Sequence, residues 1–192
     1  MATPVGKVLS VNVGSVREYE YALPGVLSGN HLPSVGSPPE ASILPETTRR
    51  IARLGTPLTP NDLNDGEASF PEFHAVYMDA ESFAHYEKTG KFRDGTVLVK
   101  ELLSVGSKKA PSGKGYFMGE FTGLEAAIKD SKRFKDEPGN WAYFSFGHKY
   151  PLKAEVSKNT VAACNQCHQD NAKEDWVFSQ YYPALRAAAP KK

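Results

Sequence analysis

The pattern of hydrophobic and polar positions along the chain predicts a β-rich fold. From residue 70 onward, Phe73, Ala75 and Tyr77 alternate with their neighbours at the period of two that a strand requires. Further segments rich in Val, Leu and aromatic residues are also expected to be strands. A turn over residues 110–115, rich in Pro and Gly, gives the strongest hairpin signal in the chain. The strands expected after the first are Thr96–Val105, Tyr116–Thr122 and Trp141–Phe146.

Helices are expected at three places. Ile51 and Leu54 share one face of a short helix over residues 46–54, which Gly55 would end. Asp79 can cap a helix over residues 80–88, which Gly90 would stop. Near the C-terminus, apolar residues recur at helical spacing, and Pro183 is expected to end or kink that helix. These apolar positions are Ala172, Trp176, Tyr181 and Leu185. The sum is an α+β fold: an antiparallel sheet with a few helices and a C-terminal helix.

Length and composition indicate one domain with an appendage. The chain has 192 residues, which favours one domain over two. Residues 1–45 are dense in Pro, Gly and Ser and are predicted to form an irregular arm, whereas residues 46–192 form the single domain. The net charge of +1 argues against nucleic acid as a partner. The apolar runs are too short for a membrane span.

The two cysteines of the chain lie in one motif, Cys164-Asn165-Gln166-Cys167-His168. A C-x-x-C-H sequence is typical of c-type haem attachment, in which both thiols form thioethers and the histidine ligates the iron. A redox C-x-x-C pair and a partial zinc site are the alternatives. The region lacks the alternating β and α segments expected around a redox pair, and it offers no second ligand pair for zinc. The motif therefore predicts one covalently bound haem c per chain, with Cys164 and Cys167 as tethers and His168 as the metal ligand.

Three further points remain open from the residues alone. The group opposite His168 is undecided: Met or His would favour electron transfer, and an open position would favour catalysis or gas binding. Lys100 interrupts an apolar strand, either as a desolvated nucleophile or as an edge residue that reaches solvent. Glu125 stands among small and apolar residues, either as a proton shuttle or as a surface carboxylate. The candidates opposite His168 are Met78, Met118, His31, His74, His85 and His148.

Several segments together resemble the cytochrome P-460 family of bacterial mono-haem c-type proteins that oxidise hydroxylamine. The resemblance covers roughly residues 46–188, and His74 stands where an arginine is expected in a close relative. The matching segments are Thr59–Gly66, Val76–Asp79, Lys88–Leu102, Gly115–Glu120, Glu137–Trp141 and Cys164–Arg186.

This resemblance implies specific roles. Lys100 matches the lysine that is crosslinked to a haem meso carbon, and Glu125 matches a distal carboxylate that accompanies hydroxylamine oxidation. The implied reaction converts hydroxylamine to nitrous oxide at an open-site ferric haem, with nitric oxide and nitrite as side products. Phe70, Phe73 and Phe121 are candidates for an apolar distal wall. The alternatives are a gas-binding protein of the cytochrome c-prime beta type and a plain electron carrier.

The resemblance and the motif also imply an assembly, an electron partner and a location. A homodimer is the usual assembly of the family, and a soluble c-type cytochrome is the expected electron acceptor. Covalent haem attachment implies the periplasm. The chain begins Met1-Ala2-Thr3-Pro4, without a basic and apolar leader, so the expectation is that a signal peptide has been removed.

Overall fold

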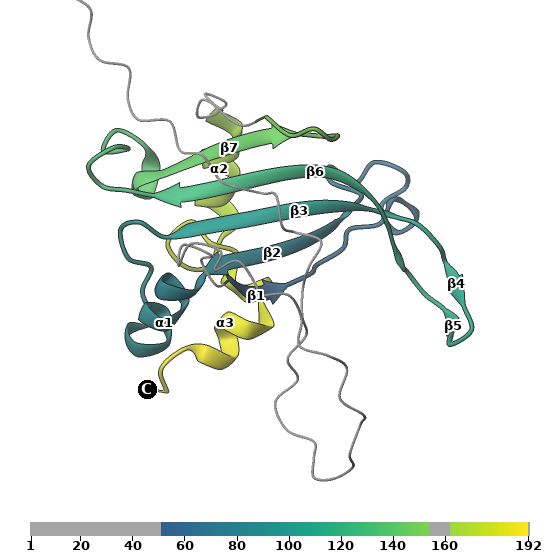
Figure 1. Cartoon of the computed structure of the whole chain (residues 1–192), viewed down its shortest axis with the longest axis horizontal. Coiled ribbons are helices and arrows are strands. Elements are labelled where there is room, and N and C mark those ends of the chain that lie inside the picture. Colours follow the sequence, from purple (N-terminus) through teal and green to yellow (C-terminus); the bar gives the residue numbers. More distant parts are fainter. Residues whose placement is uncertain (1–50, 154–161, 192) are drawn as a thin grey trace, which may run out of the picture.

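The computed structural model describes residues 51–153 and 162–191. Five antiparallel strands form one sheet in the order β1-β2-β3-β6-β7, and the chain visits them in that order (Figure 1). The strands are β1 Ile51–Gly55, β2 Phe73–Asp79, β3 Val97–Val105, β6 Met118–Lys129 and β7 Trp141–Gly147. The helices are α1 Ala80–Thr89, α2 Ala162–Asn171 and α3 Pro183–Ala188, with short 3-10 turns η1 Asn61–Leu63, η2 Pro138–Asn140 and η3 Ser179–Tyr181. The prediction of a β-rich α+β fold is confirmed.

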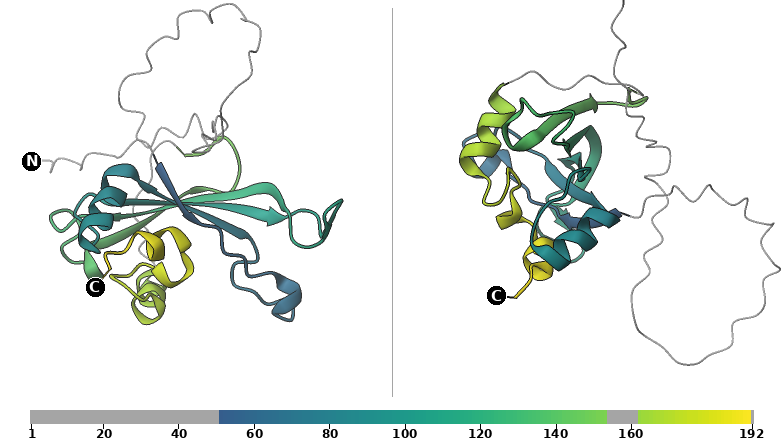
Figure 2. Two further views of the ribbon diagram at one scale, coloured as in Figure 1. Left: turned by 90° about the horizontal axis from the view of Figure 1, so that it is seen from below. Right: turned by 90° about the vertical axis from the view of Figure 1, so that its left-hand side faces the viewer.

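The two faces of the sheet carry different apolar clusters. On one face, Met78, Leu98 and Trp141 pack with Tyr86 of α1 and Leu185 of α3. Figure 2 shows α2 and the C-terminal segment lying on this side, which we call the helix face. The opposite face carries a second cluster that includes Leu124, Ala126, Ile128, Phe144 and Phe146. Alternation along β3 and β6 therefore decides which side chains lie under the helices.

The entry into α1 follows the sequence prediction. The Asp79 carboxylate accepts hydrogen bonds from the backbone N–H of Ser82 (2.9 Å) and of Val97 (2.9 Å). The first bond caps the helix, and the second ties its start to β3. Gly90 ends α1 in the left-handed conformation with φ +68°. The capping and stop residues predicted from the sequence are both confirmed.

Two sequence predictions about helices were wrong. Residues 51–54 form strand β1 and not a helix, because pairing with β2 buries Leu54 and leaves Ile51 exposed at the edge; residues 46–50 lie outside the described part. Pro183 begins α3, where its missing N–H has no helical partner to lose, and so does not end a helix there. The segment between α2 and η3 is a loop in which Trp176 has a left-handed backbone.

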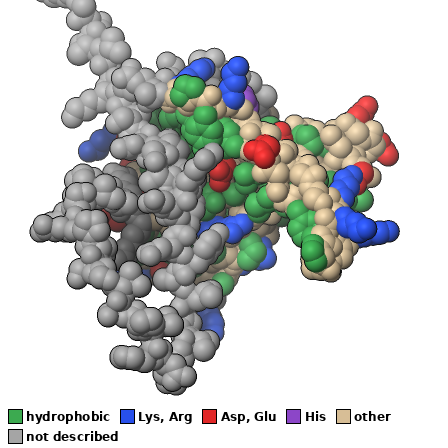
Figure 3. All heavy atoms as spheres, turned by 45° about the vertical axis from the view of Figure 1, so that its right-hand side comes forward, with side chains coloured by type: hydrophobic (Ala, Val, Ile, Leu, Met, Phe, Trp, Pro, Cys, Tyr) green, Lys and Arg blue, Asp and Glu red, His purple; other side chains and the backbone are tan. Residues whose placement is uncertain are grey.

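A two-stranded hairpin projects beyond the sheet between β3 and β6 (Figure 1). It consists of β4 Lys109–Ala110 and β5 Gly113–Lys114, as the turn signal predicted. At its base Gly106 and Gly119 approach so closely that a Cβ on either would lie 2.8 Å from the other's Cα. Figure 3 shows basic side chains gathered near this projection, where the sequence has Lys108, Lys109 and Lys114, and hydrophobic side chains over the adjacent described strands.

The described helices include none long and apolar enough to cross a bilayer.

Candidate functional site

Helix α2 carries the cysteine motif. Cys164, Cys167 and His168 are spaced three and four positions apart, so a helical backbone brings them to one side. Both thiols are free; Cys164 is half-buried and Cys167 is exposed. The helix thus presents two accessible thiols and an imidazole together, as attachment of a haem through this motif requires.

His168 is held in one tautomer by the loop that follows α2. Its Nδ1 lies 2.8 Å from the Trp176 carbonyl oxygen. A carbonyl only accepts, so Nδ1 carries the proton and Nε2 keeps its lone pair. Burial lowers the pKa of His168 below its ordinary value of 6.5, which keeps the ring neutral at pH 7. A neutral imidazole with a free Nε2 is the form that binds iron.

Two aromatic rings fix the orientation of the His168 ring. The Tyr143 ring of β7 lies 4.6 Å away, centroid to centroid, and the Phe178 ring lies 4.7 Å away. Burial raises the pKa of the Tyr143 hydroxyl far above its ordinary value, so this side chain is uncharged. The imidazole is thereby held between the sheet and the C-terminal loop.

On the sheet, Lys100 and Glu125 form an ion pair. They are directly opposite each other in the β3–β6 register, and Lys100 Nζ lies 2.6 Å from Glu125 Oε2. Each side chain is 28% exposed. Lys100 Nζ also lies 4.9 Å from the centre of the Phe70 ring. Lys100 is therefore neither an edge residue reaching freely into solvent nor unpaired, and Glu125 is not an isolated surface carboxylate.

The ion pair and the motif helix share the helix face. Lys100 alternates in phase with Leu98, and Glu125 in phase with Ala127, which pairs with Tyr143. Burial, followed by the Glu125 charge, raises the pKa of the Cys164 thiol, and Lys100 lowers it. The pKa of His168 responds to the same two charges. The four sequence-predicted groups are thus brought into one electrostatic environment.

His74 of β2 borders the same region. Its ring meets the Phe70 ring edge-on at 5.9 Å, and its buried Nε2 has no hydrogen-bond partner among the described residues. Burial first, and the Lys100 charge second, lower the pKa of His74 to about 4. This position therefore supplies a neutral imidazole where an arginine was expected.

Other sequence candidates lie elsewhere. Met78 is enclosed in the core at 1% exposure, and Met118 lies at the start of β6. Phe73 and Phe121 pair with Leu103, in phase with the opposite face of the sheet, so they do not line the Lys100 side; the expectation for these two rings was wrong. Of the remaining histidines, His85 is on α1, His148 lies against the Thr122 carbonyl, and His31 lies outside the described residues.

The sequence interpretation missed the loop over residues 172–178. Trp176 was assigned only to an apolar helical pattern and Phe178 was given no role, whereas the structure places the Trp176 carbonyl and the Phe178 ring against His168. Tyr143 was counted only as part of a strand. A hydrogen-bond acceptor for Nδ1 is a general need of a ligating histidine, but the backbone carbonyl that meets it has no sequence signal.

The site defines a class of protein. Two accessible thiols, a neutral histidine with a free Nε2 and an enclosing aromatic shell fit a haem, with iron at His168. A sequence model of the cytochrome P460 family matches residues 45–179, and the chain belongs to that family of haem proteins. Membership makes haem its cofactor and oxidoreductase chemistry its general function. No curated protein matches the chain.

Proposed function

We propose that this protein oxidises hydroxylamine to nitrous oxide, with nitric oxide and nitrite as side products, at a haem c tethered by Cys164 and Cys167 and ligated by His168. The observation that carries the proposal is the Lys100–Glu125 pair, held at 2.6 Å on the helix face. A reactive amine and a proton acceptor then occupy the sheet surface next to the attachment helix. An electron carrier or a passive gas-binding site needs neither group.

The haem, when bound, supplies the iron that takes electrons from the substrate. Two hydroxylamine molecules give one nitrous oxide, one water, four protons and four electrons, so the site must export protons as well as electrons. We assign proton uptake to the Glu125 carboxylate, which the ion pair with Lys100 orients in this structure. Phe70 covers the Lys100 amine and limits access of water to it.

Lys100 is proposed to bond through Nζ to a haem meso carbon. Starting from the Lys100 ammonium, the nitrogen loses two N–H protons and the meso carbon loses its C–H proton as the N–C bond forms, so three protons and two electrons are released. An oxidant of the peroxide class takes up the two electrons and two of the protons. The lysine nitrogen then no longer carries the ammonium charge. Glu125 therefore loses its cationic partner on crosslinking and is left free to accept protons from substrate.

The first test is a haem-peptide map combined with the ferrous spectrum. Wild-type protein should yield a haem peptide that joins Lys100 to the Cys164–His168 segment, with a red-shifted Soret band. Lys100→Met should keep the thioether-bound haem and lose the shift. A matched control is Lys108→Met, which removes a lysine paired with Asp62 at 2.7 Å near the projecting hairpin. A Lys100 peptide free of haem in the wild type would contradict the crosslink and favour a gas-binding protein of the cytochrome c-prime beta type.

The second test addresses Glu125. Glu125→Gln keeps the shape and removes the proton-accepting charge, and should lower hydroxylamine turnover about 100-fold with unchanged haem content. Glu120→Gln, on the same strand, is the control and should leave turnover unchanged. Wild-type turnover in Glu125→Gln would remove this residue from the mechanism.

Assembly, location and electron partner are also proposals. We propose a periplasmic homodimer that passes electrons to a soluble c-type cytochrome. The family resemblance supports all three. Light scattering of the haem-loaded protein tests the dimer: a monomer mass at micromolar concentration would contradict it.

A further inference from the structure

We propose that Lys129 and Asp175 are a positioning pair that fixes the Trp176 carbonyl against His168 and thereby sets the strength of the iron–histidine bond. The inference rests on the proposed ligation by His168, and it assigns a function to two charged residues remote from the Lys100–Glu125 pair. Neither residue touches the imidazole. Both act through the loop that carries its hydrogen-bond acceptor.

The first step is the set of partners around Lys129. Its Nζ donates to both carboxylate oxygens of Asp175 at 2.9 Å and to the Gly139 carbonyl at 2.9 Å. It also lies 5.5 Å from the centre of the Trp141 ring. Lys129 is only 14% exposed and Asp175 31%, so solvent screens this pair less than a surface pair. One ammonium thus connects the end of β6, the turn η2 and the loop after α2.

The second step is the backbone that the pair holds. Asp175 and Trp176 both have left-handed conformations, with φ +46° and φ +60°. A residue with a Cβ is strained in this conformation, so the conformation persists only where the surroundings enforce it. The Trp176 ring packs on Gly139 so closely that a Cβ there would lie 2.4 Å from the ring. Lys129 therefore fastens Asp175, and η2 supports the side chain of the next residue.

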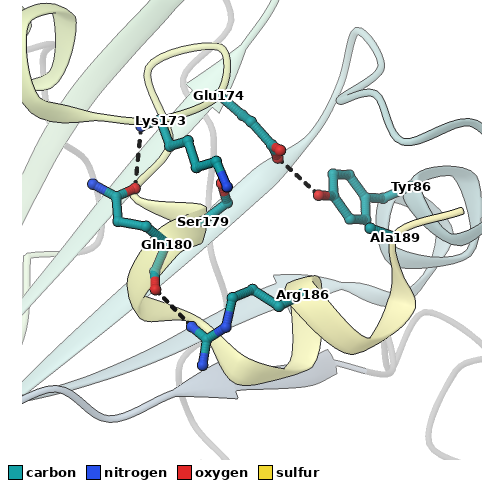
Figure 4. Close-up of a pocket in the computed structure, with 7 residues that line it drawn as sticks. All are labelled: Tyr86, Lys173, Glu174, Ser179, Gln180, Arg186 and Ala189. Atoms are coloured by element: carbon teal, nitrogen blue, oxygen red, sulfur yellow. Dashed lines mark hydrogen bonds between the residues drawn. The ribbon is translucent and has the colours of Figure 1, made fainter. Parts of the chain in front are cut away.

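The third step is a separate set of contacts that hold the same loop, at residues next to Asp175, shown in Figure 4. The Tyr86 hydroxyl of α1 donates to Glu174 at 2.8 Å, and the Lys173 N–H donates to the Gln180 side chain at 3.1 Å. The Val177 N–H donates to the Glu174 carbonyl at 2.7 Å and closes the turn. These contacts hold Lys173, Glu174 and Val177, whereas the Lys129–Asp175 ion pair holds the residue directly before Trp176, whose carbonyl accepts from His168.

The consequence for the ligand follows from hydrogen bonding. An acceptor on Nδ1–H increases the basicity of the ligating Nε2 and strengthens its bond to the metal. If the Trp176 carbonyl moves away, the imidazole becomes a weaker donor, and the reduced iron is favoured over the oxidised iron. Lys129 and Asp175 therefore tune the haem without touching it.

The test uses the haem-loaded protein and two readouts, the iron–histidine stretching band of the ferrous form and the midpoint potential. In Lys129→Met and in Asp175→Asn the band should move to lower wavenumber and the potential should become more positive, with haem content unchanged. Lys129→Arg, which can still pair with the carboxylate, should restore both toward wild type. Asp175→Asn is the milder variant, so the proposal can still be tested with it if Lys129→Met folds poorly.

Two controls separate positioning from general loosening. Tyr86→Phe removes the bond to Glu174, which holds the same loop one residue before Asp175, and Lys108→Met breaks an ion pair near the hairpin; neither should move the band. An equal shift in Tyr86→Phe would assign the effect to the loop as a whole and overturn the proposal. A wild-type band in both Lys129→Met and Asp175→Asn would also overturn it. A wild-type protein without any iron–histidine band would instead overturn the ligand assignment to His168.

Discussion

The two halves of the candidate site are built by different means. Lys100 and Glu125 stand on neighbouring strands, where the register fixes their positions and many ladder hydrogen bonds share the constraint. The His168 side depends on a loop with two left-handed residues, held by a few side-chain interactions. A substitution in the sheet half should therefore change chemistry more than structure. Removal of the Lys129–Asp175 interaction in the loop half should disturb both chemistry and structure.

The substitution with the largest expected effect is Gly139→Ala, which tests how strongly the loop half depends on the packing of Trp176. The new Cβ would overlap the Trp176 ring at 2.4 Å, and Gly139 also needs φ +62°. We expect the free energy of unfolding to fall by about 3 kcal/mol or more, measured by urea denaturation. The control is Gly66→Ala, where φ is +83° with nothing within 4 Å of the new Cβ; it should cost only about 1 kcal/mol. Equal costs would show that the packing of Trp176 on Gly139 contributes nothing.

The pH dependence of stability tests the sheet half, to which His74 of β2 belongs. The pKa of His74 is lowered to about 4 in the folded protein, against an ordinary 6.5 in the unfolded chain. The unfolded chain therefore binds a proton first, so stability is fully present above pH 6.5 and declines as the pH falls toward 4. Because His74 is partly exposed, we expect a loss on the order of 2 kcal/mol.

Comparison with variants assigns that loss to His74. Urea denaturation at pH 7 and pH 4.5 should show a smaller decline for His74→Gln than for the wild type. The exposed His148 provides the control, and His148→Gln should retain the wild-type decline. If His74→Gln loses as much stability as the wild type over this range, the titration belongs to other groups.

The substitution with the smallest expected effect is Tyr86→Phe, which tests one hydrogen bond that holds the loop. Tyr86→Phe removes one hydrogen bond to Glu174 and leaves the buried ring in place. We expect a loss of about 1 kcal/mol in the free energy of unfolding. Tyr116→Phe removes a similar bond to Asp62 that is exposed to solvent, and it should change stability by less than about 0.5 kcal/mol. A cost for Tyr86→Phe as small as that for Tyr116→Phe would mean that this fastening point does not stabilise the loop.

The same difference explains what the sequence could predict. The period of two located β2 and β3, and the cap at Asp79 located the start of α1, because these signals are local. The pairing of Lys100 with Glu125 could not be derived from periodicity, since it depends on the hairpin between the strands and on bulges in the register. Strand β1 was missed because tertiary pairing outweighed its helical spacing.

The loop half was the least predictable part. The left-handed backbone conformation is usually adopted by Gly or Asn, but here Asp175 and Trp176 adopt it. Their conformation depends on Lys129 and Gly139, which are distant in sequence. The attachment motif itself was evident because Cys164, Cys167 and His168 are local, whereas the residues that orient His168 come from three separate segments.

The projecting hairpin makes the protein convenient to modify. Its tip, Pro111-Ser112, lies at a turn beyond the sheet, and Gly106 and Gly119 let the two chain segments cross at its base. Exposed tips of this kind accept inserted residues with little effect on the domain that bears them. A fluorophore, a spin label or a surface-attachment tag placed there would allow the protein to be immobilised on an electrode or observed as single molecules.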